Sequence, residues 1–179
     1  MQNVAYQKLM DNLCDIVAEE QAKLGYMKEP IRLYYPLSSL NHFFGGDVSA
    51  DEMQEKLSKF KSFAYDKFGE VEITHKGERF CFFLSERATE YVHQNGGQNQ
   101  FIFDLVALLA KHGTVMEEVE ALFAKQKDAY EIEKMNHGEF DYMIHFVNSK
   151  DKYLYCFKDE GCHIIYHRFL PEDYEDLGL

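Results

Sequence analysis

The sequence predicts an α+β protein, and three patterns carry that prediction. Apolar residues recur with the 3.6-residue period of amphipathic helices through most of residues 1–127. Within that part, residues 70–84 indicate a β-hairpin: Val71 and Ile73 alternate with Glu72 and Thr74, as in a half-buried strand. From residue 128 onward, short runs of aromatic and β-branched residues are separated by turn residues. We therefore expect a helical N-terminal portion with one hairpin, followed by a C-terminal antiparallel β-meander.

The first elements follow from residue spacing and from start signals. An apolar stripe predicts a helix over residues 3–24. The segment "PIRLYYP" predicts a short strand between two prolines, which are tolerated only at strand ends or sheet edges. A short helix is expected over 37–44. Ser49 and Glu52 then form a capping-box pattern that starts a longer helix ending at Phe68, because each side chain can satisfy the other residue's backbone N–H.

The later elements are predicted from the same kinds of signal. Lys76 and Gly77 are expected at the hairpin turn. Three helices are expected after the hairpin, over 85–95, 99–112 and 115–126. Gly96 and Gly97 separate the first two, and Thr114 with Glu117 predicts a second capping box for the third. Four strands complete the chain, in "YEIEKM", "EFDYMIHFV", "KYLYCF" and "CHIIYHRFL".

Size and composition favour a cytoplasmic protein. The chain has 179 residues, 46% of them hydrophobic, which is enough to build a core without disulfides. Its four cysteines form no C-x-x-C pair, and the N-terminus has no secretory signal pattern. No apolar run approaches the roughly 18 residues that span a bilayer. We expect reduced thiols and no membrane association.

Charge argues against nucleic acid as a partner. The formal net charge is −12, and residues 128–179 supply −7 of it, with 5 basic and 12 acidic side chains. A field of this sign repels nucleic acid and favours basic partners or simple solubility. The predicted organisation is a helical portion over 1–127 and a meander with an acidic C-terminus over 128–179, within one continuous globular unit.

Residues 31–95 resemble a winged helix-turn-helix in the order and size of their elements. The resemblance implies that the helix over 50–68 would read DNA and that the hairpin would be the wing. The candidate nucleic-acid-binding residues are Lys56, Lys59, Lys76 and Arg79. However, residues 49–95 hold 7 basic and 9 acidic side chains, whereas DNA binders normally show a clear basic excess. Nucleic-acid binding is therefore the alternative hypothesis.

The segment "CFKDEGCHIIYHRFLPEDYED" most resembles a chemical site. Its cysteines and histidines suggest zinc, yet His163 and His167 on a strand would have Cα atoms about 13 Å apart. A turn at 159–161 would place Lys158 opposite Cys162, so that cysteines and histidines would point to opposite faces of the sheet. We therefore predict no metal site and no cofactor, and a solvated acidic tail after the last strand.

The preceding hairpin predicts a surface instead. Pairing Phe146 with Tyr153 also pairs Asp141 with Lys158 and leaves both faces of the sheet apolar, so each face needs cover. A homodimer contact or a protein partner could supply that cover. The predicted binding residues on the aromatic–histidine face are Tyr142, Tyr153, Tyr155, His163 and His167. A hydrolase or metalloprotein using His145, His163, His167 and nearby acids is a further alternative.

The C-terminal stretch "GCHIIYHRFLPEDYEDLGL" and the helix-rich-then-β layout resemble a bacterial domain family of unknown function. The resemblance implies no activity, cofactor or catalytic residue. The function that the sequence favours is a non-enzymatic cytosolic interaction or regulatory module.

Overall fold

The computed structural model describes residues 2–95, 99–136 and 138–176. It confirms an α+β protein with a C-terminal antiparallel meander. Contacts divide the chain into two compact units, Met1–Asn99 and Gln100–Leu179. The sequence placed this division after residue 127 instead. The difference arises because the helices after residue 99 pack on the C-terminal sheet. The Gly96–Gly97 break lies outside the described residues.

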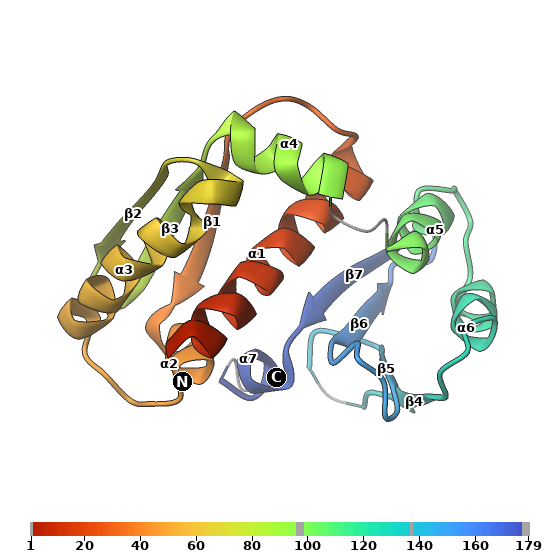
Figure 1. Ribbon diagram of the computed structural model, residues 1–179. Helices are drawn as coiled ribbons and strands as arrows, with labels where there is room; N and C mark the ends of the chain where they lie inside the picture. The colour runs from red at the N-terminus through yellow and green to blue at the C-terminus, as the bar shows by residue number, and fades with distance from the viewer. Residues whose placement is uncertain (1, 96–98, 137, 177–179) are drawn as a thin grey trace. The chain divides into compact units, whose positions relative to one another are not determined.

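The N-terminal unit contains four helices and three strands among its described residues (Figure 1). In chain order these are α1 (Gln2–Leu24), β1 (Ile31–Pro36), α2 (Leu37–Phe44), α3 (Ala50–Phe68), β2 (Val71–Lys76), β3 (Arg79–Leu84) and α4 (Glu86–Asn95). The sheet is antiparallel in the order β1-β3-β2, so that β3 is central. The helices cover one face of this sheet.

The core of this unit forms where those helices meet the sheet. The inward side chains of the strands are buried, and they alternate with exposed ones as strand geometry requires: Leu33, Tyr35, Val71, Ile73, Phe80, Phe82 and Leu84. Phe60 of α3 packs edge-on against Phe82 at 6.4 Å between ring centroids. Helix α3 begins at the predicted Ser49–Glu52 capping box, and the residues of its apolar stripe are buried.

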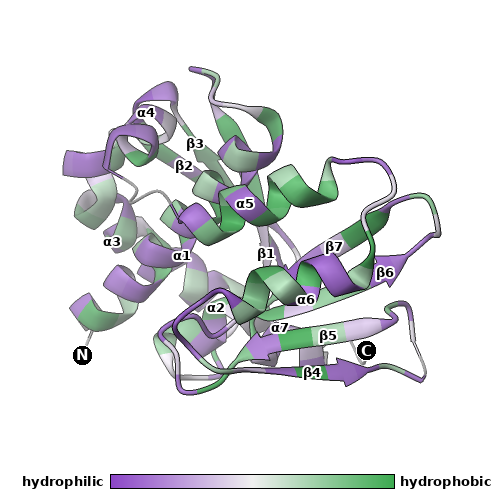
Figure 2. Ribbon diagram, turned by 90° about the vertical axis from the view of Figure 1, so that its right-hand side faces the viewer, coloured by the Kyte–Doolittle hydropathy of each residue, from purple (hydrophilic) through white to green (hydrophobic). Residues whose placement is uncertain are grey.

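The C-terminal unit has two layers. Helices α5 (Gln100–Leu109) and α6 (Met116–Ala124) cover one face of a sheet in the order β4-β5-β6-β7. The strands are β4 (Tyr130–Lys134), β5 (Tyr142–Phe146), β6 (Leu154–Asp159) and β7 (Ile164–Phe169), and a short helix α7 (Pro171–Asp176) follows. Figure 2 shows α5 as mostly hydrophobic, in accord with its role as a core helix.

One local prediction in this unit was wrong. Thr114 does not cap α6: its hydroxyl donates to the carbonyl oxygens of Leu108 and Lys111 and closes the end of α5 instead. The backbone amide of Val115, just before α6, donates to Glu118. The acidic segment after β7 forms the short helix α7, in which Glu172 and Glu175 are exposed.

Candidate functional site

The predicted aromatic face of the C-terminal sheet is largely a helix-covered core. Phe101 of α5 and Phe123 of α6 stack edge-on against Tyr155, at 5.6 and 5.3 Å between centroids. Tyr155 is fully buried, so its assignment as a contact residue was wrong. The sequence pattern identified an apolar face correctly, but helices of the same unit already cover that face.

Tyr155 has a polar role within this core. Its hydroxyl donates to Asp151 Oδ2 at 2.6 Å, while Asp151 Oδ1 accepts the backbone N–H of Tyr153 at 3.0 Å. Burial, together with the nearby Asp151 carboxylate, raises the pKa of Tyr155 far above its ordinary value. The hydroxyl therefore remains protonated and serves as a structural donor.

Tyr142 and Tyr153 lie at the edge of the same face. Both are half-buried, and each carries a cation over its ring. The guanidinium of Arg168 lies 4.0 Å from the centroid of Tyr153, and the ammonium of Lys134 lies 5.9 Å from that of Tyr142. These contacts are internal to the sheet, so they hold the two tyrosines in place.

The two histidines do not share this face, because the predicted β6–β7 register was wrong. The structure pairs Cys156 with His167 and Asp159 with Ile164, which leaves a four-residue turn over 160–163. The predicted register differs by three residues, and an odd shift moves every side chain of a strand to the other face. His167 therefore shares a face with Cys156, and His163 lies in the turn.

The second face of this sheet is partly covered. His167 is exposed and lies beside Phe140 and Phe169, at 5.7 and 6.0 Å between ring centroids. Tyr174 of α7 packs on Phe169 at 5.9 Å. Burial raises the pKa of the Cys156 thiol to about 11, so that thiol is not a nucleophile near neutral pH.

The β6–β7 turn brings a thiol, an imidazole and a carboxylate into contact. Sγ of Cys162 lies 3.1 Å from Nδ1 of His163, and Nε2 of the same ring lies 3.0 Å from Oε2 of Glu160. All three residues are exposed. This cluster was not predicted from the sequence, because His163 was expected on a strand face, although the adjacent Cys–His pair after a glycine was a visible signal.

The remaining histidine–acid candidates form ordinary surface pairs. His145 lies 3.4 Å from Glu131 across the β4–β5 pair, and Asp141 lies 3.4 Å from Lys158, as the register prediction required. Over residues 2–95, 99–136 and 138–176, no group of three or more His, Cys, Asp or Glu side chains is placed to hold a metal ion. In the same ranges no helix is both long and apolar enough to cross a membrane.

The outer face of the N-terminal sheet is open, and its ladder forms a grid of three rows. Across β1, β3 and β2 the registers align Arg32 with Phe83 and Glu72 in one row. The next rows are Tyr34 with Cys81 and Thr74, and Pro36 with Arg79 and Lys76. Tyr34 is 55% exposed, so its ring is available to a partner. We call these nine residues the outer face.

Two arginines stack on the aromatic rings of the outer face. The guanidinium carbon of Arg32 lies 4.9 Å from the centroid of Phe83, and that of Arg79 lies 5.1 Å from the centroid of Tyr34. Shallow depressions lie at both ends of the grid, one beside Tyr34 and Arg79 and the other beside Arg32 and Phe83. This surface was not predicted from the sequence: in the structure, alternate residues of "IRLYYP" and "RFCFFL" point away from the core.

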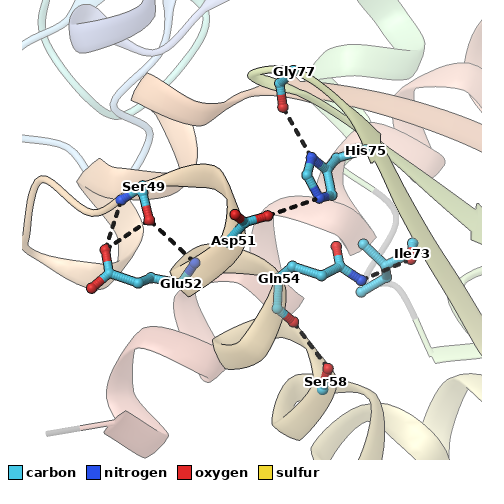
Figure 3. A network of polar contacts seen from close by, with 8 residues as sticks. All are labelled: Ser49, Asp51, Glu52, Gln54, Ser58, Ile73, His75 and Gly77. Atoms are coloured by element: carbon cyan, nitrogen blue, oxygen red, sulfur yellow. Dashed lines mark hydrogen bonds and ion pairs between the residues drawn. The ribbon is translucent and has the colours of Figure 1, made fainter.

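The four basic residues of the nucleic-acid hypothesis do not form one patch. Lys76 and Arg79 are paired at the hairpin tip, and Lys59 is exposed on α3. Lys56 instead lies over the ring of Phe44 of α2, with its ammonium 5.7 Å from the centroid. On the hairpin side the α3 N-terminus presents Asp51, 4.0 Å from His75 Nε2 (Figure 3).

Most of the chain matches a known protein family. A family model described as "Domain of unknown function, E. rectale Gene description (DUF3877)" matches residues 6–178. No curated protein and no solved structure matches the chain.

Proposed function

The chain belongs to this bacterial family of unknown function, and on that premise we propose that it is a cytoplasmic interaction module whose outer face binds an acidic segment of a partner protein. The observation that carries the proposal is an open sheet face on which two arginines stack on aromatic rings. All four cysteines are free thiols, which suits a reducing compartment.

Local charge supports an acidic partner. The outer face carries three cations and one carboxylate: Arg32, Lys76 and Arg79 against Glu72. The whole chain has a net charge of −12, so this face is a positive region on an acidic protein. Complementary charge speeds encounter and disfavours partners of the wrong sign. An acidic segment fits this surface better than a basic or neutral one.

The stacking of the arginines supports carboxylate recognition. A guanidinium that lies over an aromatic ring is held in place while its N–H edges stay available for bidentate contact. Among the described residues, neither Arg32 nor Arg79 forms an ion pair with a carboxylate. Both cations therefore keep their donors for a ligand.

The spacing of the grid suits an extended peptide. Arg32 and Arg79 stand two rows apart on neighbouring strands, and two rows correspond to about 13 Å along a strand. Two carboxylates four residues apart on an extended segment have the same separation. Between them, Tyr34 and Cys81 offer an apolar surface for a side chain of the ligand.

Selection from a displayed peptide library on the full chain tests this proposal. We expect the selected peptides to combine two acidic residues with an apolar one between them. Binding should weaken as salt rises from about 50 to about 500 mM, because exposed ion pairs are screened. Selected peptides without acidic residues, or no selected sequence above background, would overturn the proposal.

The C-terminal sheet, which the sequence predicted as the binding surface, provides the control for this test. His167 and Ile165 remain exposed on its second face. His167→Ala should leave peptide binding unchanged if the outer face is the site. Sedimentation of the free chain distinguishes a partner from self-association: a dimer abolished by R32E/R79E would make a second copy the occupant and contradict the proposed peptide ligand.

A winged-helix nucleic-acid binder is the second candidate, and the strand order β1-β3-β2 with the order α1-β1-α2-α3-β2-β3 favours it. Asp51 beside the hairpin and the scattered lysines weigh against it. The test is retention of duplex DNA at about 50 mM salt, where nonspecific binding is strongest. If the wild-type chain retains duplex DNA and Lys76→Glu and Arg79→Glu abolish that retention, this candidate is favoured. If the wild-type chain retains no DNA, this candidate is removed.

A further inference from the structure

The β6–β7 turn holds its thiol, imidazole and carboxylate through backbone contacts. The amide of Glu160 donates to the carbonyl of His163 at 3.0 Å, and the amide of Gly161 donates to Asp159 Oδ1 at 2.8 Å. Gly161 has φ +82°, a conformation that other residues rarely adopt. The amide of Gly113, in the α5–α6 connection, donates to the Cys162 carbonyl at 3.2 Å. Hydrogen bonds within the turn and from the α5–α6 connection therefore fix its conformation.

Glu160 determines which nitrogen of His163 faces the thiol as an acceptor. In a neutral imidazole one nitrogen carries the proton and the other accepts. A carboxylate 3.0 Å from Nε2 favours the proton on that nitrogen. Nδ1 is then the acceptor, and it lies 3.1 Å from Sγ of Cys162. This is the arrangement of a nucleophile beside a base that a third group orients.

The other three cysteines lack this arrangement. Burial raises the pKa of both Cys14 and Cys156 to about 11. Cys81 is half-buried at the centre of the outer face and has no acid–base neighbour among its row partners, Tyr34 and Thr74. Among the four, Cys162 alone combines exposure with an imidazole in contact.

We propose that Cys162 is a reactive thiol site that undergoes exchange with low-molecular-weight disulfides. In the reaction His163 Nδ1 accepts the thiol proton, and the Cys162 sulfur attacks one sulfur of the disulfide. A new S–S bond joins Cys162 to that half of the reagent. The old S–S bond breaks, and the other half leaves as a thiolate that takes up a proton. Glu160 is a positioning residue that holds the imidazole.

The reaction of the full chain with an aromatic disulfide that releases a coloured thiolate tests this proposal. We expect one fast phase, which Cys162→Ser removes and Cys81→Ser leaves intact. His163→Phe should slow that phase by about tenfold or more, because proton transfer to the base is lost. A fast phase that survives Cys162→Ser, or an unchanged rate in His163→Phe, would overturn the proposal.

Glu160→Gln tests positioning separately from folding. It should slow the fast phase less than His163→Phe does, because the base remains but loses the carboxylate that orients its ring, and Glu160→Asp should restore part of the rate. A wild-type rate in Glu160→Gln contradicts the role of Glu160. Incubation with oxidised glutathione, followed by peptide mass spectrometry, gives a second measurement. The mixed disulfide should form at Cys162, and modification at Cys81 instead would overturn the assignment.

Discussion

The guanidinium of Arg79 on β3 lies 5.1 Å from the ring centroid of Tyr34 on β1, on the face of the sheet that the helices of the N-terminal unit leave uncovered. The alternate residues on the same two strands, Tyr35 and Phe82, are buried and 5.2 Å apart between centroids. One pair of strands thus has one face in the core and one face exposed to solvent.

Stability measurements distinguish these two faces. Tyr34→Ser removes an exposed ring and a cation–π contact, so it should lower the free energy of unfolding by about 1 kcal/mol or less. Phe82→Ala leaves a cavity in the core and should cost about 3–5 kcal/mol. Urea unfolding of both variants measures this. Equal losses would mean that the ring of Tyr34 is buried in the folded protein.

The effect of Tyr155→Phe on stability should depend on pH. Tyr155→Phe leaves Asp151 without one donor and should cost about 1–2 kcal/mol at neutral pH. Because folding raises the pKa of Tyr155, its stabilisation is complete below the unfolded pKa near 10 and declines above it. The difference in the free energy of unfolding between wild type and Tyr155→Phe should therefore decrease from pH 10 upward, by up to about 1.4 kcal/mol per pH unit. Urea unfolding between pH 7 and 11 checks this, and a constant gap contradicts it.

The start of α3 gives a matched pair of serine substitutions. Ser49 accepts the Glu52 amide, and Glu52 Oε2 accepts the Ser49 amide and hydroxyl (Figure 3). Ser49→Ala should lower stability by about 1 kcal/mol. Ser58→Ala, in the middle of the same helix, should be neutral or slightly stabilising, because alanine is the better helix former. Thermal unfolding compares the two, and equal effects would contradict the capping role.

These hydrogen bonds to the Glu52 carboxylate also lower its pKa, with the Ser49 amide as the main cause. The contribution of the capping box is therefore present above the ordinary carboxyl pKa and declines as the pH falls through the lowered value. The loss of unfolding free energy caused by Ser49→Ala should therefore be smaller in strong acid than at neutral pH.

The sequence predicted elements well because their signals are local. The range of α3 and the hairpin were predicted from caps and periodicity. The β5–β6 register was predicted from Phe146 opposite Tyr153, which also places Asp141 beside Lys158. Each of these depends on neighbours that are close in the chain or joined by one hairpin.

The outer face and the thiol cluster depend on less local facts. Arg32 meets Phe83 only because β1 pairs with β3 and not with β2, which no local pattern decides. The β6–β7 register depends on the length of the turn. The turn has four residues and not the predicted three, and within it the His163 ring contacts the Cys162 sulfur. The helical cover of Tyr155 followed from long-range packing of Phe101 and Phe123.

Calorimetric titration of a selected acidic peptide into wild type and two charge variants tests the central claim most directly. R32E/R79E should weaken binding by about tenfold or more, since charge-assisted hydrogen bonds contribute about 1.5–3 kcal/mol each. R32Q/R79Q should weaken it less. K8E/K67E changes the net charge equally at exposed sites of α1 and α3, which pack on the other face of the sheet, and should bind as wild type does. Equal affinities for R32E/R79E and K8E/K67E would contradict recognition by the outer face.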